Sequence, residues 1–280
     1  MIFFQQLRIH QWSKNFLIFL PAALTSSTEN VILLLKVFIS FSLLASALYC
    51  INDLIDVKKD KLHPIKKKRP LASDKLNLYQ VLGLSAICIF LFYLFAYSFD
   101  SIIIFFFFYY ILISLLYNIF LKRIFIINVI TLSCLYVLRV MLGSKVIGIE
   151  ATSNLIIFIF FFFLALASIK KYIDISVQKK KNISEFKTFK NLIILANAIT
   201  VSTLVVYLNS DLAEVVIGKL NLYALIIAVT YWLTLASHKT ISGKIKTDPV
   251  IYFLKDKISI ITGIVIIFLL TFKLDNIILY

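Results

Sequence analysis

Apolar stretches of about 20 residues recur along this chain from one end to the other, and this feature constrains its fold more than any other. A helix of that length crosses a hydrocarbon core of roughly 30 Å. Hydrophobic residues make up 61% of the 280 positions and charged residues only 15%, whereas soluble domains average roughly 45–50% and about 25%. A water-soluble fold would leave several stretches with nothing to bury against. The sequence therefore predicts an integral membrane protein.

All of these stretches are expected to be helices, because lipid offers no other partner to the backbone of an unclosed span. The first contains Pro21, so we expect it to be bent or partly interfacial. Nine apolar spans are predicted, and they run roughly over residues 14–27, 31–55, 76–98, 101–121, 124–143, 153–175, 189–209, 220–238 and 257–278. The predicted fold class is an all-α bundle of about nine transmembrane helices, forming a single domain over residues 1–280.

The basic residues are concentrated in alternate connections between these spans. The connections near 56–75, 176–188 and 239–256 are rich in lysine, and the short connection near 121–124 contains Lys122 and Arg123. The connections that alternate with these four contain few basic residues. By the positive-inside rule, the N-terminus is predicted to be cytoplasmic and the C-terminus to lie outside. A net charge of +15 could also indicate a nucleic-acid-binding protein. The placement of the charges, and the absence of an RNA-recognition pattern, predict no nucleic-acid partner.

The most specific chemical signal lies at the end of the second span, where Asn52-Asp53-x-x-Asp56-x-x-x-Asp60 begins while the span is still apolar. The three aspartates fall at i, i+3 and i+7, so they project from one helix face. Like charges in one stripe repel unless a cation lies between them, and carboxylates so spaced suit Mg²⁺ that also bridges to substrate phosphates. The other interpretation is a solvated helix end that neighbouring lysines balance.

Three further features carry two interpretations each. Lys66 and Arg69, in the loop that follows, could hold phosphate oxygens or mark topology and a lipid surface. Arg139 lies inside a span, where a cation indicates a functional site, although it could form a buried structural pair. Tyr117 and Tyr172 could contact a substrate, or could be ordinary interfacial tyrosines.

The aspartate motif, followed by Arg69-Pro70-Leu71, resembles the first signature of the UbiA superfamily of intramembrane prenyltransferases. The N-terminal Arg8-x-x-Gln11-Trp12-x-Lys14-Asn15 and the later Tyr117-x-x-x-Leu121-Lys122 are similar to that superfamily as well. The resemblance covers nearly the whole chain. It implies a helical bundle with a Mg²⁺- and diphosphate-binding site at its cytoplasmic face.

One departure points to a branch of this superfamily. Typical aromatic prenyltransferases carry a second acidic motif after the sixth helix, where this chain has Lys170-Lys171-Tyr172-Ile173-Asp174. The chain instead resembles the polyprenyl-phosphate phosphoribosyltransferases, which have a similar loop of Asp, His-Pro, Lys and Arg-Pro. The branch also has an Arg-x-x-x-Gly segment, matched by Arg139 and Gly143, and an Arg and a Glu where this chain has Lys171 and Asp174.

The branch implies transfer of 5-phosphoribose from phosphoribosyl diphosphate to a polyprenyl phosphate, with release of diphosphate. It implies a bacterial plasma (inner) membrane enzyme of cell-envelope polysaccharide synthesis, a site that faces the cytoplasm, and a homo-oligomer. The implied catalytic residues are Asp53, Asp56, Asp60, Lys66 and Arg69, and the three aspartates are the implied ligands of Mg²⁺. The implied substrate-binding residues are Lys14, Asn52, His63, Tyr117, Lys122, Arg139, Lys170, Lys171, Tyr172 and Asp174.

Two other functions stay open on the sequence. The same aspartates would serve transfer of a prenyl chain from its diphosphate to an aromatic or other acceptor, and the lone Asp174 keeps that reading alive. A transporter of anionic lipids would explain Arg139 and the basic face. Such transporters are typically built from repeats with broken helices, and the sequence shows neither.

Overall fold

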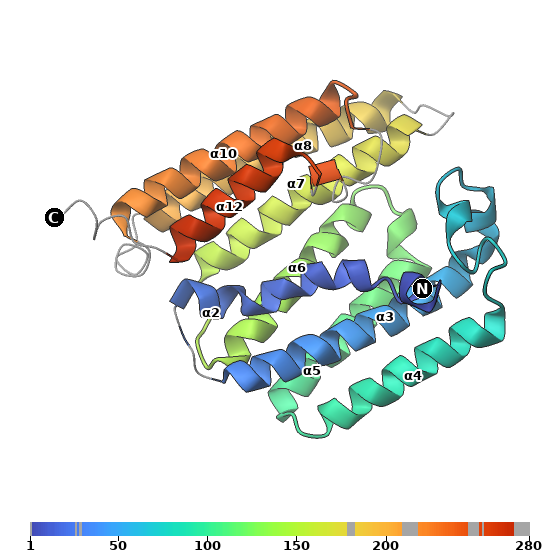
Figure 1. Ribbon diagram of the computed structural model, residues 1–280. Coiled ribbons are helices and arrows are strands. Elements are labelled where there is room, and N and C mark those ends of the chain that lie inside the picture. Colours follow the sequence, from blue (N-terminus) through green and yellow to red (C-terminus); the bar gives the residue numbers. More distant parts are fainter. Residues whose placement is uncertain are drawn as a thin grey trace. The chain divides into compact units, whose positions relative to one another are not determined.

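The chain is described by a computed structural model that covers residues 2–25, 27, 30–177, 183–208, 218–245, 252–253 and 255–271. Its regular elements are all helical over these residues, as the apolar pattern predicts. The residues group into two compact units, which interleave in sequence (Figure 1). The first unit consists of residues 1–21, 28–131 and 138–150, and the second of residues 22–27, 132–137 and 151–280.

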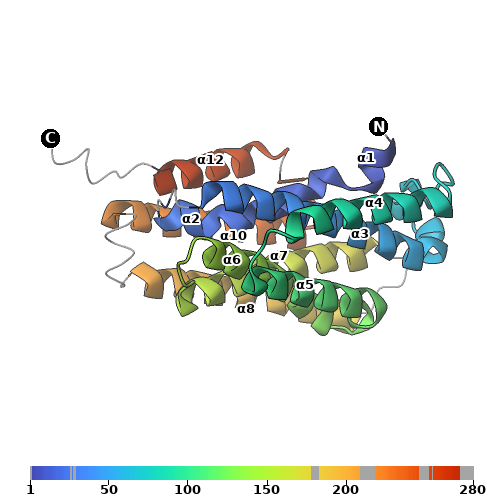
Figure 2. The ribbon, with the colours of Figure 1, turned by 90° about the horizontal axis from the view of Figure 1, so that it is seen from below.

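The first unit contains the aspartate motif, on the longest helix of the chain. Its elements are α1 (Ile2–Gln6), the 3₁₀ helix η1 (Ile9–Phe19), α3 (Val31–Leu62), η2 (Lys66–Lys68), α4 (Leu78–Ala96), α5 (Ser101–Ile119), η3 (Leu121–Arg123) and most of α6 (Ile127–Val146). Helices α3 and α4 lie side by side in two perpendicular views (Figures 1 and 2). The connection between α3 and α4 packs on both helices through the buried Cys50, Leu71, Leu76 and Val81, with Leu7, Leu54, Val57 and Leu84 around them.

The second unit is a set of neighbouring helices, α7 (Ser153–Val177), α8 (Ile183–Leu208), α10 (Lys219–Ile241) and α12 (Lys257–Thr271). Helix α8 packs against α7 and α10, and α10 packs against α12 (Figure 1). The short α2 (Leu20–Thr25) lies at the junction in sequence, and its Leu24 packs on the buried Leu222, Leu225 and Leu269.

Seven of the predicted spans are confirmed as helices long and apolar enough to cross a membrane, namely α3, α4, α5, α6, α7, α8 and α10. The first predicted span is a 3₁₀ helix followed by the six-residue α2, and Pro21 lies inside that short helix. The last predicted span begins as the apolar α12, and residues 272–280 lie outside the described part of the chain. The predicted count of about nine spans is therefore not confirmed.

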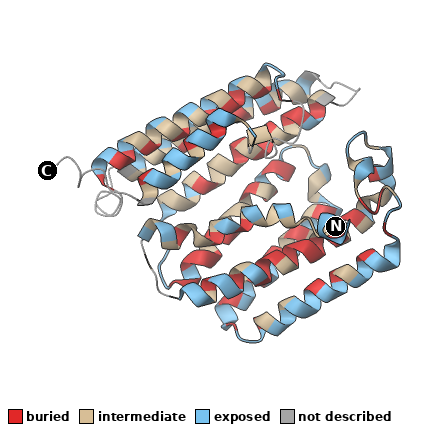
Figure 3. Ribbon diagram, viewed as in Figure 1, coloured by how far each residue is buried: buried red, intermediate tan, exposed pale blue. Residues whose placement is uncertain are grey.

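Helix burial separates the inner helices from those that face lipid. More than half of the apolar window is buried in α3 and α6, but only 17% in α4. Figure 3 shows the same contrast, with α4 mostly pale blue and α3 marked by runs of red. Apolar side chains exposed on a spanning helix match hydrocarbon, so they need no protein partner.

Two prolines, Pro64 and Pro70, shape the connection that follows α3. A residue before proline is disfavoured in the helical region, and His63, before Pro64, is extended (φ −84°, ψ 132°), so α3 ends at Leu62. Arg69, before Pro70, is extended as well (φ −62°, ψ 145°), so η2 ends at Lys68. The chain therefore turns twice and returns toward α3 before α4 begins. Asn77 and Gln80 form a reciprocal capping box at the start of α4.

Candidate active site

The three aspartates lie on the last three turns of α3. Asp53 and Asp60 are buried, with side chains only 3% and 5% exposed, whereas the Asp56 side chain is 17% exposed. A buried carboxylate is costly unless it is paired and hydrogen-bonded. The partners of these carboxylates therefore define the site.

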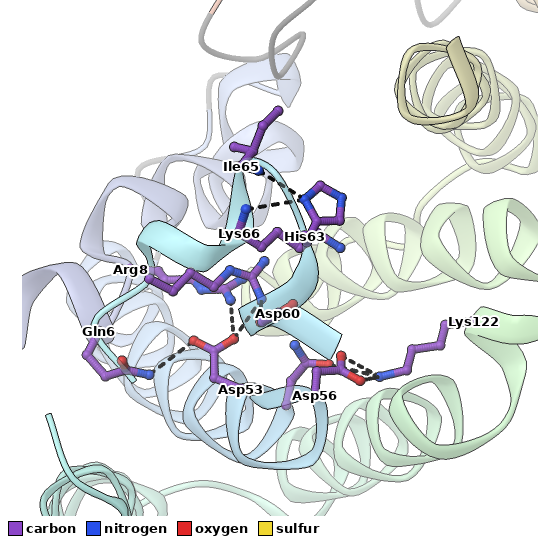
Figure 4. Close-up of polar contacts among 11 residues, drawn as sticks. Gln6, Arg8, Asp53, Asp56, Asp60, His63, Ile65, Lys66 and Lys122 are labelled. Carbon is purple, nitrogen blue, oxygen red and sulfur yellow. Dashed lines mark hydrogen bonds and ion pairs between the residues drawn. The ribbon is translucent and has the colours of Figure 1, made fainter. Parts of the chain in front are cut away.

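Asp53 is held by the N-terminal segment. Gln6 is fully buried, and its Nε2 donates a hydrogen bond to Oδ2 of Asp53 at 3.0 Å. The guanidinium of Arg8 forms an ion pair with Oδ1 of the same carboxylate. Figure 4 shows both side chains reaching Asp53 from α1 and the turn that follows it. The segment that precedes the first apolar span thus contributes directly to the site.

The returning loop supplies the second cation. Nη1 of Arg69 donates to Oδ1 of Asp53 at 3.0 Å and also to Oδ2 of Asp60. One guanidinium therefore joins two carboxylates that lie seven positions apart on α3. The loop is fixed behind it, because Leu71 and Leu76 are buried against Cys50 and the backbone N–H of Ser73 donates to the carbonyl of Arg69 at 2.8 Å.

Asp56 faces another partner. Nζ of Lys122, in η3, lies 2.6 and 2.8 Å from the two carboxylate oxygens of Asp56, and 3.4 Å from Oδ1 of Asn52. In Figure 4, Asp56 points toward Lys122, and Asp53 points toward Gln6 and Arg8. The site therefore gathers three carboxylates and three cations from α3 and three other segments: the N-terminus, the α3–α4 loop and η3.

The backbone of the N-terminal segment is held in a special conformation. Arg8 adopts the left-handed region (φ 51°, ψ 46°), which is uncommon and strained for a residue other than glycine. Its guanidinium lies over the Tyr49 ring, 4.9 Å from the centroid. The neighbouring Trp12 donates to Oγ of Ser46 at 2.9 Å, and that hydroxyl donates to the carbonyl of Leu7 at 2.8 Å. These contacts tie the segment to α3.

Arg139, also in the first unit, donates hydrogen bonds to two neutral side chains. Its side chain is buried on α6, where Nε donates to Oδ1 of Asn15 at 2.9 Å and Nη2 donates to the hydroxyl of Tyr110 at 3.1 Å. The guanidinium also lies over the rings of Phe41 and Tyr110, about 5 Å from their centroids. Asn15 in turn donates to Oγ of Ser42 at 3.0 Å. These bonds join η1 to α3, α5 and α6, and the predicted role of Arg139 in substrate binding stays a prediction.

Four other predicted residues also belong to the first unit. His63 shapes the loop, because its Nδ1 accepts the backbone N–H groups of Ile65 and Lys66 at 3.2 and 3.3 Å (Figure 4). The Lys66 side chain is half-buried, as are those of Lys14 in η1 and Tyr117 in α5. Their predicted contacts with substrate stay predictions.

The predicted basic segment belongs to the second unit, in the last turns of α7. Lys170 and Lys171 are half-buried and Asp174 is exposed. Tyr172 is buried, and its ring lies 4.0 Å, centroid to centroid, from that of Phe186 in α8. That packing explains Tyr172 without a ligand. The predicted role of all four residues in substrate binding stays a prediction.

Sequence reasoning missed Gln6 and Arg8 as members of the site, together with Asn15 and Tyr110 around Arg139. Arg8 and Asn15 carry a signal in the sequence, because both belong to the N-terminal motif that resembles the UbiA superfamily. Gln6 and Tyr110 carry none. Their positions become meaningful only when the N-terminal segment folds back on α3 and when Tyr110 of α5 comes within hydrogen-bond distance of Arg139 in α6.

The arrangement fits a metal that a substrate helps to hold. Over the described residues, no group of three His, Cys, Asp or Glu side chains is placed to hold a metal ion by itself. Mg²⁺ in phosphate-transfer sites takes one or two carboxylates, several waters and the substrate phosphates. Asp53, Asp56 and Asp60 provide such carboxylates, and the three cations beside them are suited to phosphate oxygens.

Three proteins that are similar to this chain in sequence carry different descriptions. An uncharacterized protein of Sinorhizobium fredii, y4nM, is 27% identical over 93% of this chain and 54% of its own length. The nodulation protein NoeC of Azorhizobium caulinodans is 24% identical over 93% of this chain and 89% of its own length. A decaprenyl-phosphate phosphoribosyltransferase of Corynebacterium glutamicum is 30% identical over 62% of this chain and 54% of its own length. The chain thus spans about half the length of the first and third of these relatives.

Solved structures share the fold. A UbiA homolog from Aeropyrum pernix K1 has a TM-score of 0.69 at 14% identity, over 92% of this chain and 97% of its own. A homolog from Archaeoglobus fulgidus bound to GPP and Mg²⁺ has a TM-score of 0.68 at 15% identity, over 96% of this chain and 97% of its own. The model of the UbiA prenyltransferase family matches residues 16–255, from η1 to just before α12. The cluster at the end of α3 therefore belongs to a multi-pass membrane protein of the UbiA prenyltransferase family.

Proposed function

We propose that this chain transfers 5-phosphoribose from phosphoribosyl diphosphate to a polyprenyl phosphate at the cytoplasmic face of a bacterial plasma membrane. Diphosphate is the leaving group, and Mg²⁺ is the cofactor. The observation that carries the proposal is the cluster of Asp53, Asp56 and Asp60 with Arg8, Arg69 and Lys122. Such a mixture of carboxylates and cations suits a substrate that brings both a metal and several phosphate oxygens.

The bonds exchanged in this reaction balance without an added base. An oxygen of the acceptor phosphate, already ionised at pH 7, forms a bond to C1 of the ribose. The bond from C1 to the diphosphate oxygen breaks, and diphosphate leaves with the electron pair. Mg²⁺ would neutralise the charge that develops on this leaving group. The residues of the chain therefore act by positioning and by electrostatics.

Each group has a part in that scheme. Asp53, Asp56 and Asp60 would hold the metal against the donor diphosphate, with Asn52 beside them. Arg69 and Lys122 already lie within contact distance of these carboxylates, so they can reach phosphates bound there. Lys66 would join them. Lys170 and Lys171 of α7 stand where the second acidic motif is usual, and extra cations suit a donor with a separate 5-phosphate.

Similarity to known proteins supports phosphoribosyl diphosphate as the donor, but one comparison also supports a prenyl diphosphate. Decaprenyl-phosphate phosphoribosyltransferases from three genera of bacteria are 25–30% identical over 62% of the chain. An alternative function is transfer of a prenyl chain from prenyl diphosphate to an aromatic or other acceptor. One observation favours it: the Archaeoglobus homolog of the same fold was solved with GPP and Mg²⁺. Asp53, Asp56 and Asp60 would serve both reactions, since both donors carry a diphosphate.

The test offers both donors to the protein purified in detergent. Labelled phosphoribosyl diphosphate is incubated with a polyprenyl phosphate, with and without Mg²⁺, and a parallel reaction contains labelled prenyl diphosphate with aromatic acceptors. We expect Mg²⁺-dependent label in the lipid fraction of the first reaction. We expect Asp53→Asn to abolish it. Asp74→Asn is the matched control, because Asp74 is 76% exposed and pairs with the exposed Lys61. Label only in the parallel reaction would replace the proposal by prenyl transfer.

A further inference from the structure

We propose that Arg8 exchanges partners during substrate binding, leaving Asp53 for the donor diphosphate when a divalent cation takes the Asp53 carboxylate. The inference rests on the proposed function only in requiring a donor that carries a diphosphate. It assigns the N-terminal segment a specific task. Arg8 would be the group that makes metal and diphosphate bind together instead of separately.

The crowding around Asp53 is the first argument. Its Oδ1 accepts from both Arg8 and Arg69, and its Oδ2 accepts from Gln6. Figure 4 shows Gln6 and Arg8 on this carboxylate. A metal ion that approached Oδ1 would therefore meet two guanidinium groups. Because like charges at contact distance repel strongly where water is scarce, the metal and both arginines cannot share this oxygen. At least one arginine must leave.

Arg8 is the arginine free to leave. Arg69 also pairs with Asp60, and its loop is anchored by buried leucines. Asp53 is the one carboxylate that contacts Arg8 over the described residues. The Arg8 backbone is also in the strained left-handed region. Removal of Arg8 from Asp53 thus breaks one ion pair and leaves the framework of α3 and its loop in place.

Diphosphate gives the displaced arginine a partner. The Arg8 side chain is only 16% exposed, so moving it away from Asp53 without a new anion would leave a poorly solvated charge. A phosphate accepts the planar guanidinium through two parallel hydrogen bonds. The metal would then replace Arg8 on Asp53 while the phosphate replaces Asp53 on Arg8. Neither ligand alone completes that exchange.

The exchange predicts effects of opposite sign from a single substitution. In Arg8→Gln, the Asp53 oxygen is no longer blocked by Arg8, so a metal alone should bind more tightly. The same change removes a ligand of the diphosphate, so diphosphate should bind more weakly. Coupling between two ligands typically amounts to about 5–150-fold in affinity. We expect Mn²⁺ alone to bind about fivefold more tightly and diphosphate in saturating Mn²⁺ to bind about tenfold more weakly.

The experiment measures binding and not turnover. Mn²⁺ binding to the full chain in detergent is followed by loss of the electron paramagnetic resonance signal of free Mn²⁺. Binding of labelled inorganic diphosphate at saturating Mn²⁺ is measured by equilibrium dialysis. The matched control is Arg123→Gln, which removes an exposed arginine beside Lys122. It should leave both affinities within twofold of the unsubstituted chain.

A second variant keeps the test decisive if Arg8→Gln does not fold. Arg8→Lys keeps the charge that blocks Asp53 but loses the bidentate fork, so we expect unchanged Mn²⁺ binding and weaker diphosphate binding. Opposite changes in Arg8→Gln, or this pattern in Arg8→Lys, support the exchange. Affinities that fall together, or that both stay unchanged, overturn it. Because no assay contains phosphoribosyl diphosphate or lipid, failure of phosphoribosyl transfer and failure of the exchange are separate results.

Discussion

Gly143 marks a close approach of α6 to η1 in the first unit, and its replacement by alanine tests that packing directly. A Cβ atom at Gly143 would lie 2.0 Å from the carbonyl oxygen of Ile18 and 2.8 Å from its carbonyl carbon. Both atoms belong to the backbone of η1, so no side-chain rotation can relieve the contact. Ordinary contacts of a Cβ begin at 3.4 Å. The η1 backbone would therefore have to retreat by about 1.4 Å, the difference between these distances.

The expected cost follows from that displacement. Inserting one methyl group into a packed interior typically costs about 1–3 kcal/mol, and we expect the upper end because the obstacle is backbone. Alanine would otherwise stabilise a helix interior by about 0.5–1 kcal/mol relative to glycine. The retreat of η1 would also pull on Asn15, whose hydrogen bonds to Arg139 and Ser42 join η1 to its neighbours. Gly143→Ala should therefore lower the free energy of unfolding by about 2 kcal/mol.

The measurement is a thermal melt of the purified protein in one detergent, and the chain offers internal controls. Gly83 in α4 and Gly263 in α12 have nothing within 4 Å of an added Cβ. Their alanine variants should melt at or above the temperature of the unsubstituted chain. A shift of about 1 kcal/mol corresponds to roughly 2–4 °C in domains of 150–250 residues. If Gly143→Ala melts with these controls, the close approach of η1 to α6 is wrong.

Three further changes have expected outcomes. Arg139→Met should destabilise the fold by about 1–3 kcal/mol, because it leaves the Asn15 acceptor without the Arg139 donor. A double-mutant cycle with Asn15→Ala should show a coupling energy of at least about 0.5 kcal/mol. If the losses of stability in the two single variants simply add in the double variant, the contact is refuted. Asp256 caps α12 through Ser259 and pairs with Lys239 at 2.7 Å, so Asp256→Ala should cost about 1 kcal/mol by thermal melting at pH 7, and an unchanged melting temperature would contradict that. Burial alone would raise the pKa of the Asp256 carboxyl, but hydrogen bonds from Lys239 and Ser259 outweigh it and lower that pKa below its ordinary 3.8. A carboxyl whose pKa is lower in the folded than in the unfolded chain stabilises the fold at pH values above its unfolded-state pKa, and this stabilisation disappears as the pH falls through its folded-state pKa. The difference in stability between the unsubstituted chain and Asp256→Asn should therefore be full above about pH 4 and shrink below it. A difference that grew in acid would contradict the lowered pKa.

Local rules in the sequence predict much of this fold. The spans at α3, α4, α5, α6, α7, α8 and α10 follow from apolar length alone, because a lipid-facing helix is recognised without reference to its neighbours. The end of α3 at His63-Pro64 follows from the restriction that proline places on the preceding residue. The first predicted span shows the limit of length. Residues 9–19 form a 3₁₀ helix that is tied to other helices by Trp12 and Asn15.

The candidate site divides in the same way. Asp53, Asp56 and Asp60 are visible in the sequence because a helix repeats every 3.6 residues, so their spacing fixes a shared face before any packing is known. Arg69 and Lys122 could be named from the motifs that carry them, but not the carboxylates that each would meet. Separation along the chain carries no information about which cation pairs with which acid.

The sequence by itself determined that this is a helical membrane protein with three aspartates on one face of a helix end, because hydropathy and helical periodicity are local properties. Its motifs also placed it in the UbiA family, because a family signature is read directly from residue types and their spacing. Only the tertiary structure decided that Gln6 and Arg8 contact Asp53, that Arg69 joins two aspartates, and that Arg139 donates to Asn15 and Tyr110. The physical reason is that burial makes an unpaired charge costly, so each buried charge finds its partner where the folded chain brings one within reach.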